Sequence, residues 1–511
     1  MRIGLLPLDE RPVNTRLPQQ VGAVAGAVVS LPPEHLLSAR KRPADTAALT
    51  RWLEGAPVGE QPADALVVSL DMLGFGGLIA SRTSNDPAAS VLGRWETLRR
   101  VRRGSPGCAI HGVSLVTRAP NSYDSDEEPD YWQEIGADLH RLGGALHRDY
   151  LDERDGLLES ASELRGRLPG HAVDDFTRRR LRNHTVNLAA LSLACDKILD
   201  TLLITADDTA ERSAGSLEQH WLAHWRDVLA GAGENVLMHP GADEVATVLV
   251  ARTVLAALRG EPLRIAVVCA VPGGLDRVAP YENVPLGVGA RGHIRATGSV
   301  PVEPDGADLV LVVHPPDKAG GDWAHRHPEV RRADDADVKA TAEAVASYLG
   351  RGAAVAVADC AYPNGSDPAL LEALSQRLPL ASLAGYAGWN TAGNTLGSVI
   401  AQGALFAASR QAGTFDAAAH RRLLLHRLVE DGAYMADARG RALAAFTDRT
   451  RHSTLPSDLV QPVTNWIAGN LADSPASFPG FEGWTVAASS VRLPWQRTFE
   501  LDFELTAPDG K

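Results

Sequence analysis

Cysteine is scarce in this chain of 511 residues, which has only Cys108, Cys195, Cys269 and Cys360. The four lie far apart and form no C-x-x-C pair, which excludes a zinc ribbon and argues against a disulfide scaffold. Three of them lie inside or beside apolar runs, where small buried side chains are expected. Cysteine therefore points to neither a metal site nor a covalent framework.

Long hydrophobic runs and an excess of positive charge are also missing. No stretch approaches the roughly 20 apolar residues that a helix needs to cross a bilayer. The apolar run at the start of the sequence is too short for a signal peptide, and Asp9 and Glu10 follow it directly. We therefore expect a cytoplasmic protein with no membrane partner. The formal net charge of -13 argues against nucleic acid as the main partner, because phosphate binding needs clustered lysine and arginine.

Several motifs with known chemistry are absent. The chain has no G-x-G-x-x-G, no phosphate-binding P-loop, no H-E-x-x-H and no G-x-S-x-G. We therefore expect no cofactor and no bound metal. His35, His239 and His314 follow apolar runs, but isolated histidines are usually structural. An alternative, in which carboxylates hold a metal, uses Asp71, Asp207, Asp208 and Asp243.

The chain does contain a repeated alternation of apolar runs and helical segments. Each run ends abruptly in polar, glycine or proline residues, which is typical of parallel strands joined by helices. The runs cover residues 3–8, 27–31, 65–70, 110–116, 201–205, 235–238, 264–271, 308–313, 353–358 and 380–384. They predict an α/β protein, with a closed (β/α)8-like barrel preferred and a doubly wound open parallel sheet as the alternative. Both folds bind ligands at the carboxyl ends of their strands.

The pattern also predicts how the chain is divided. We expect the first part of a barrel over 1–263, an inserted or re-entrant small α/β unit over 264–335 and the remaining barrel strands over 336–403. Residues 404–511 should form C-terminal helices and a closing β-hairpin. The hairpin is predicted by alternation over 484–505, which is rich in valine, phenylalanine and threonine.

Asp207 and Asp208 are the predicted catalytic residues. They directly follow the most apolar run, 201–205. Two adjacent carboxylates repel each other, so one pKa rises and that group can act as an acid while the other stays ionised. The alternative is that Asp208 or Thr209 caps a helix that begins near Ala210.

Other polar residues at strand ends are the predicted substrate-binding residues. Arg11 could clamp a carboxylate, or could instead belong to a buried ion pair. Trp389 and the amides around it suit a sugar, because an indole stacks on a sugar ring and amides bind hydroxyls. The alternative there is a turn with a packed tryptophan. The complete set is Asp9, Arg11, Asn14, Asp71, Arg118, Asn121, Asp359, Asn364, Tyr386, Trp389 and Asn390.

Five motifs in one order resemble the bacterial family called domain of unknown function 4127. The resemblance spans nearly the whole chain and implies one family-wide unit rather than a fusion, but it implies no activity. The motifs are Leu6-Pro7-Leu8-Asp9-Glu10-Arg11-Pro12, Ser69-Leu70-Asp71-Met72-Leu73, Thr205-Ala206-Asp207-Asp208, Gly388-Trp389-Asn390-Thr391 and Leu493-Pro494-Trp495-Gln496-Arg497-Thr498-Phe499-Glu500.

The expected layout also resembles, at the level of architecture, hexosaminidases that use the acetamido group of their substrate. That resemblance implies that Asp207 orients the substrate and that Asp208 is the general acid. The leading hypothesis is therefore a glycoside hydrolase acting on a small sugar or oligosaccharide. A metal-dependent hydrolase or lyase is the first alternative, and a non-catalytic small-molecule-binding protein is the second.

Overall fold

The computed structural model describes residues 1–153, 158–229, 235–329, 331–446 and 454–508. The chain divides into two compact units, each made of several segments. Unit 1 comprises residues 1–10, 29–249 and 281–284, and unit 2 comprises residues 11–28, 250–280 and 285–511. Each unit is built around its own parallel sheet.

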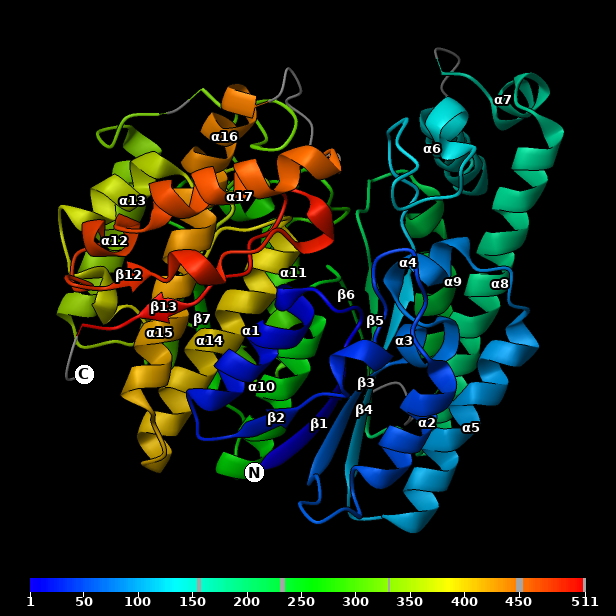
Figure 1. Cartoon of the computed structure of the whole chain (residues 1–511), viewed down its shortest axis with the longest axis horizontal. Helices are drawn as coiled ribbons and strands as arrows, with labels where there is room; N and C mark the ends of the chain where they lie inside the picture. Colours follow the sequence, from blue (N-terminus) through cyan, green and yellow to red (C-terminus); the bar gives the residue numbers. More distant parts are fainter. Residues whose placement is uncertain (154–157, 230–234, 330, 447–453, 509–511) are drawn as a thin grey trace. The chain divides into compact units, whose positions relative to one another are not determined.

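Unit 1 contains a six-stranded sheet with the order β2-β1-β3-β4-β5-β6. The core lies between this sheet and α2, α5 and α8, and includes Leu66, Ile110 and Leu202 (Figure 1). The strands are β1 (Arg2–Leu6), β2 (Val28–Ser30), β3 (Ala65–Ser69), β4 (Ala109–Val116), β5 (Thr201–Ala206) and β6 (Val236–Pro240). The helices are α2 (Thr46–Gly55), α3 (Leu70–Phe75), α4 (Leu78–Thr83), α5 (Ala88–Gly104), α6 (Trp132–Tyr150), α7 (Ala161–Arg167), α8 (Gly170–Cys195) and α9 (Ala214–Val228).

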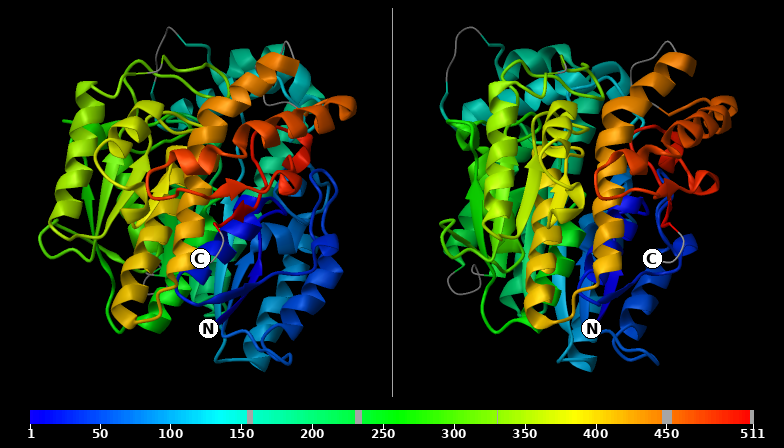
Figure 2. Two further views of the ribbon diagram at one scale, coloured as in Figure 1. Left: turned by 60° about the vertical axis from the view of Figure 1, so that its left-hand side comes forward. Right: turned by 90° about the vertical axis from the view of Figure 1, so that its left-hand side faces the viewer.

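Unit 2 contains a five-stranded sheet with the order β11-β10-β9-β7-β8. Its strands are β7 (Arg264–Val268), β8 (Val300–Val302), β9 (Leu309–His314), β10 (Val355–Asp359) and β11 (Gly385–Ala387). The helix α14 packs on β9, β10 and β11, and α12 packs on β9 and β10 (Figure 2). The helices are α1 (Pro12–Ala23), α11 (Leu286–Ala296), α12 (Ala336–Gly350), α13 (Pro368–Ser375), α14 (Ala392–Ala412), α15 (Ala417–Arg427), α16 (Arg439–Phe446) and α17 (Ser457–Leu471), with a π-helical segment, Leu428–Ala438, between α15 and α16.

The prediction of an α/β fold with parallel strands is confirmed. The strands of the described residues form two open sheets, however, and not the single closed barrel that we preferred. Closure requires the last strand to pair with the first, whereas β2 and β6 are the edges of the first sheet. After β6 the chain passes through α10 (Val245–Leu258) into unit 2 and a new sheet.

The predicted boundary between an inserted unit and the remaining barrel does not separate two sheets. The strands β7, β8 and β9 of the expected inserted unit share one sheet with β10 and β11 of the expected remaining barrel. A strand expected over 380–384 begins instead at Gly385, after the 3-10 turn Leu380–Ser382. The expected C-terminal hairpin is a short antiparallel pair, β12 (Thr485–Val486) with β13 (Leu505–Thr506). Among the helices of the described residues, none combines the length and apolarity that spanning a membrane requires.

Candidate functional site

The turn after β5 places Asp207 and Asp208 at the carboxyl end of the sheet of unit 1. The helix α9 begins only at Ala214 and is capped by Ser213, so neither Asp208 nor Thr209 serves as the helix cap considered above. Asp208 has a φ of 36°, which is in the left-handed region that side chains rarely adopt. The turn is fixed because the Thr209 backbone N–H and hydroxyl donate to the carbonyl of Tyr281, at 2.9 and 3.1 Å.

Two arginines bind this carboxylate pair. Arg82 from α4 forms a close ion pair with Asp207. Arg118, which follows β4, donates from Nη1 to Asp208 Oδ2 at 2.8 Å. The same guanidinium groups bind Glu127 and Glu128, with Arg118 Nε 2.9 Å from Glu128 Oε1. Two guanidinium groups and four carboxylates therefore share one site, with a formal charge of -2 from these six side chains.

The two aspartates differ in exposure, and burial changes the pKa of Asp207. Asp207 is 12% exposed and Asp208 is 25% exposed, so both are partly accessible. Burial raises the pKa of Asp207 to about 6, although the charge of Arg82 opposes this rise; the charge of Asp208 adds to it. A carboxyl group with a pKa near 6 can hold a proton at moderately acid pH and release it to a substrate.

Asp71 and Asp9 are buried near the ends of the neighbouring strands β3 and β1. The Leu115 backbone N–H donates to Asp71 Oδ2 at 2.9 Å. Burial nevertheless raises the pKa of Asp71 to about 7, because two backbone hydrogen bonds do not replace full hydration. Glu10, next to Asp9, accepts a hydrogen bond from the Arg40 backbone N–H at 2.6 Å and so anchors the segment after β2.

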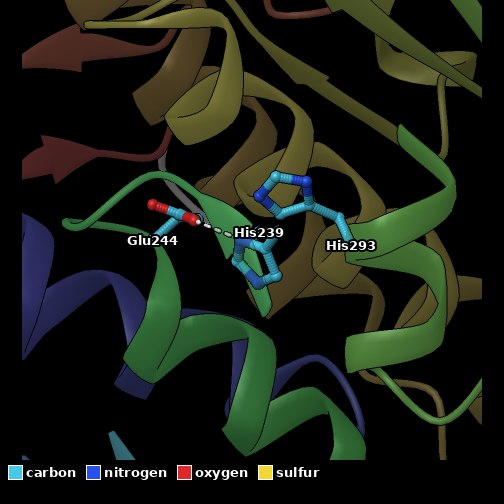
Figure 3. Close-up of side chains that lie close together, drawn as sticks. All are labelled: His239, Glu244 and His293. Carbon is cyan, nitrogen blue, oxygen red and sulfur yellow. Dashed lines mark ion pairs between the residues drawn. The ribbon is translucent and has the colours of Figure 1, made fainter. Parts of the chain in front are cut away.

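The end of β6 carries a buried pair formed by His239 and Glu244 (Figure 3). The distance between His239 Nδ1 and Glu244 Oε1 is 3.7 Å. The same Nδ1 lies 2.8 Å from the carbonyl oxygen of Pro240. Burial raises the pKa of Glu244 to about 7. Figure 3 also draws His293, which belongs to α11 of unit 2 and whose Nδ1 lies 2.9 Å from the carbonyl oxygen of Gly289.

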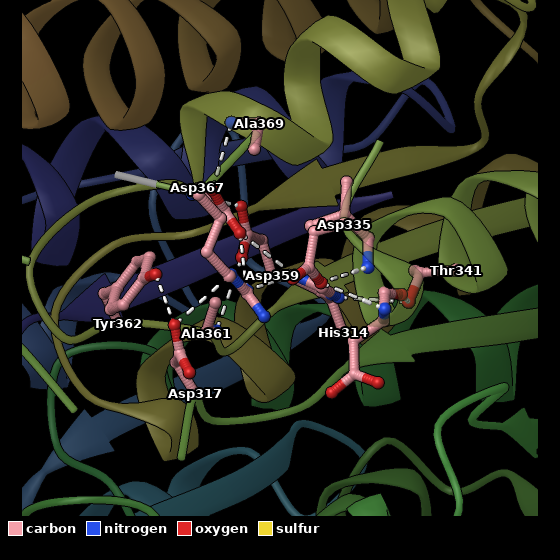
Figure 4. Close-up of polar contacts among 12 residues, drawn as sticks. His314, Asp317, Asp335, Thr341, Asp359, Ala361, Tyr362, Asp367 and Ala369 are labelled. Atoms are coloured by element: carbon pink, nitrogen blue, oxygen red, sulfur yellow. Dashed lines mark hydrogen bonds and ion pairs between the residues drawn. The ribbon is translucent and has the colours of Figure 1, made fainter. Parts of the chain in front are cut away.

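The strand ends of unit 2 carry a second polar network (Figure 4). His314 ends β9, and its Nε2 lies 3.2 Å from Asp367 Oδ2 and 2.8 Å from Arg331 Nη2. Thr341 donates its hydroxyl to the Asp337 carbonyl, so it accepts from His314 Nδ1 at 3.0 Å. The imidazole is therefore held by contacts on both of its ring nitrogens.

Asp359 at the end of β10 belongs to the same network. It accepts from the Asp367 backbone N–H at 2.7 Å and from the Tyr386 hydroxyl at 2.9 Å. Burial raises the pKa of Asp359. Burial also opposes ionisation of Asp367, but the hydrogen bond from His314 and the charge of Arg331 outweigh it and lower its pKa. The network is closed and buried, which is typical of a structural role.

The turn after β11 is built on close packing. A Cβ atom on Gly388 would lie 2.8 Å from Ser366 Oγ, so only glycine fits there without a shift. The Gly388 N–H donates to Asp431 Oδ2 at 2.9 Å, and the Asn364 N–H donates to the Asn390 carbonyl at 2.9 Å. Asn364 and Asn390 both have positive φ angles, of 65° and 62°. They therefore serve here as turn residues.

The aromatic residues that we expected to bind a sugar are buried. Trp389 is 3% exposed, donates from Nε1 to the Phe499 carbonyl at 3.4 Å and packs on the Phe499 ring. Tyr386 is fully buried. Trp389 is thus the packed tryptophan of a turn, which was the alternative considered from the sequence. The glycine at 388 lets the backbone of this turn lie close to Ser366.

Arg11 and Asn14 belong to the start of α1 in unit 2. Arg11 Nη1 lies 3.9 Å from Glu500 Oε2, and both side chains are buried. The Val13 backbone N–H donates to Glu500 Oε1 at 2.9 Å. The buried ion pair considered from the sequence therefore describes Arg11, and Asn14 is buried in the same helix.

The predicted site residues are thus divided between the two units. Asp9, Asp71, Arg118, Asn121, Asp207 and Asp208 belong to unit 1, where Asn121 is exposed in the connection after β4. Arg11, Asn14, Asp359, Asn364, Tyr386, Trp389 and Asn390 belong to unit 2. Sequence reasoning missed Glu127 and Glu128, whose only signal is the acidic run before α6.

The comparison with known families agrees with the motifs. The model of the family described as a protein of unknown function, DUF4127, matches residues 3–504. The chain therefore belongs to this family. No curated protein and no solved structure matches it.

Proposed function

We propose that this member of the DUF4127 family is a hydrolase that cleaves glycosidic bonds at the Asp207–Asp208 turn of unit 1. One observation carries the proposal: Asp207 is a partly accessible carboxyl group with a pKa of about 6, directly beside a second, arginine-paired carboxylate. Glycoside hydrolysis uses such a pair, one group as an acid and the other as a base, nucleophile or charge stabiliser.

In the proposed reaction, Asp207 donates its proton to the glycosidic oxygen as the bond to the anomeric carbon breaks. Asp208, held by Arg118 at 2.8 Å, stabilises the positive charge that develops on the sugar. A water molecule then adds its oxygen to the anomeric carbon and returns a proton to Asp207. These roles reverse those implied by the hexosaminidase resemblance, because it is the pKa of Asp207 that is raised.

Trp389, Tyr386 and Asp359 have no part in this proposal, since they are buried in unit 2. Arg82 and Arg118 instead position the two aspartates, and Glu127 and Glu128 position the arginines. Asp71 and Asp9 lie at the ends of neighbouring strands of the same sheet. They are also buried, so in this proposal they do not contact the substrate.

The test is turnover of a panel of aryl glycosides by the wild-type protein and by Asp207→Asn and Asp208→Asn. Each substitution should lower kcat by about 100- to 10,000-fold, the range of a lost general acid or base. The unfolding temperature should change little, since asparagine has nearly the same shape. Asp174→Asn, at an exposed position of α8, is the matched control and should retain full activity. Undiminished turnover in the Asp207 variant would overturn the assignment.

A further inference from the structure

The acidic run before α6 contacts two arginines that also hold the proposed catalytic pair. Arg82 Nη1 and Arg118 Nη2 both donate to one oxygen of Glu127, Oε2, at 3.1 and 3.2 Å. We infer that a carboxylate of the substrate replaces that of Glu127 on these arginines, so that the sugar cleaved at the Asp207–Asp208 turn is a uronic acid. This inference rests on the proposed function and adds to it the chemical class of the substrate.

The two arginines form a site that suits a carboxylate. A guanidinium group presents several N–H donors in a fixed plane, and carboxylate oxygens are the acceptors that match this arrangement. Arg118 donates from Nη1 to Asp208 at 2.8 Å and from Nη2 to Glu127 at 3.2 Å. The place of Glu127 is thus on the same guanidinium group that holds the catalytic Asp208. An acid group bound there belongs to a sugar ring at the bond that is cleaved.

Glu128 and Glu127 contact the same arginines but differ in exposure. Glu128 Oε1 accepts from Arg82 Nη1 at 3.2 Å and from Arg118 Nε at 2.9 Å, and its side chain is 4% exposed. Glu128 is therefore a buried bridge between the two arginines. The Glu127 side chain is 12% exposed and Arg118 is also partly exposed, so their contact lies in the accessible part of the site. A substrate carboxylate can replace Glu127 there while Glu128 keeps both arginines in position.

Glu127 is carried by an irregular connection and not by a rigid element. The connection over 117–131, all of which the structure describes, contains no helix or strand. Two contacts of its acidic part are made to side chains near the surface: Lys41 Nζ donates to the Ser125 carbonyl at 2.9 Å, and Arg40 pairs with Asp126 at 2.9 Å. Ion pairs between exposed groups contribute little to stability, so these two contacts do not oppose a movement of Glu127 strongly.

The charge of the site requires an exchange with Glu127. The two arginines and the four carboxylates that they bind carry a formal charge of -2. A further carboxylate added to this site would increase the negative charge, and like charges repel strongly where the site is partly buried. Replacement of Glu127 by the substrate carboxylate leaves the charge on the arginines unchanged. A neutral sugar has no group that competes with Glu127, so the site favours a uronide.

The first experiment compares matched ligands on the full-length wild-type protein. Glucuronate and galacturonate are titrated beside glucose and galactose, which carry a hydroxymethyl group in place of the carboxylate, and binding is measured by calorimetry. The better uronate should bind at least about tenfold more tightly than its neutral partner, because only the uronate can accept from both guanidinium groups. Aryl uronides should likewise have a higher kcat/KM than the matching aryl hexosides. Equal affinities for acids and neutral sugars would overturn the inference without reference to any variant.

Glu127→Gln distinguishes the exchange from a purely structural role of Glu127. The variant removes the competing charge, so the affinity for the better uronate should rise about tenfold, as expected when a competing bound state is removed. A structural role predicts equal or weaker binding, and that result would refute the exchange. The matched control is Glu54→Gln, which removes another arginine-paired glutamate of unit 1 and should leave uronate binding unchanged. If Glu127→Gln does not fold, the comparison of ligands on the wild type decides.

The outcome is separable from the glycosidase proposal. If the wild-type protein hydrolyses no aryl glycoside but prefers uronates in the titration, the proposed reaction is wrong and the carboxylate-binding site stands. If it hydrolyses neutral hexosides and binds uronates no better than neutral sugars, the reaction stands and the uronic acid is overturned as its substrate.

Discussion

At the scale of single residues, the proton on Asp207 controls the proposed chemistry. The acid must be protonated before it can donate, and its pKa is about 6. We therefore expect kcat/KM to fall about tenfold per pH unit as the pH rises above 6. Turnover of the best aryl glycoside, measured from pH 4.5 to 8.5, checks this. A profile that stays flat between pH 5 and 8 would contradict the role of Asp207 as the acid.

Asp71 should make the stability of the protein depend on pH. Its pKa is raised from 3.8 to about 7, so the folded state binds this proton more tightly than the unfolded state. Stability is therefore lost as the pH rises between about 4 and 7. Asp71→Asn removes this penalty while keeping an oxygen that can accept from Leu115.

Urea unfolding of the wild type and Asp71→Asn at pH 5 and pH 8 provides the measurement. The variant should gain on the order of 2 kcal/mol relative to the wild type between the two pH values, since each pKa unit corresponds to about 1.4 kcal/mol. Asp174→Asn serves as the exposed control, with the same difference from the wild type at both pH values. An Asp71 variant that behaves like this control would contradict the raised pKa.

The sequence singled out Asp207, Asp208 and Arg118, which the structure brings together, because polar residues directly after an apolar strand are recognisable in any parallel α/β protein. It did not identify Glu127 and Glu128, since ion-pair partners in a long connection carry no periodic signal. Trp389 and Tyr386 were predicted to face a ligand because glycine and asparagine surround them. In the structure the same glycine allows the chain to pack closely, so composition alone did not distinguish a binding loop from a buried turn.

At the scale of elements, Gly388 should be required for the packing of the turn after β11. In Gly388→Ala the added methyl group would lie 2.8 Å from Ser366 Oγ, which requires a shift of buried backbone. We expect a loss of about 1–3 kcal/mol, the usual cost of overpacking. Gly93→Ala is the matched control, since α5 leaves the space around Gly93 open. It should gain about 0.5–1 kcal/mol through helix propensity. Equal effects of the two substitutions on thermal unfolding would contradict the packing argument.

The elements themselves were predicted with uneven success, for physical reasons. Buried parallel strands such as β3 and β5 are continuous apolar runs and were found within one or two residues. The strand β8 has only the sequence Val-Pro-Val and gave no signal. Residues 380–384 are apolar because they pack against the core, where Leu380–Ser382 form a 3-10 turn. Their hydrophobicity alone predicts a strand.

At the scale of the whole molecule, the sequence predicts that strands and helices alternate, but it does not predict which strands pair with one another. A barrel and an open sheet use the same local units, and only the contacts of the edge strands distinguish them. Nothing in the apolar run of β6 indicates that the next strand, β7, begins a different sheet. The division of the site residues between two units follows from that change of sheet.

The interleaving of the units leads to a prediction about fragments. Residues 1–263 were expected to form the first part of one barrel, but residues 11–28 belong to unit 2 and Tyr281–Val284 belong to unit 1. A fragment of residues 1–263 therefore lacks Glu500, to which Val13 donates, and Tyr281, which accepts two hydrogen bonds from Thr209.

We expect this fragment to unfold with lower cooperativity than the full chain. Hydrogen exchange should be faster by at least about tenfold in α1 and in the turn at 207–213, because a lost hydrogen bond costs on the order of 1 kcal/mol and several are lost together. The strands β3 and β4 serve as the internal control, since their pairing lies wholly within the fragment. Full protection of α1 and of the turn in the fragment would contradict the division into interleaved units, because each would then be stabilised without the distant segments that complete it.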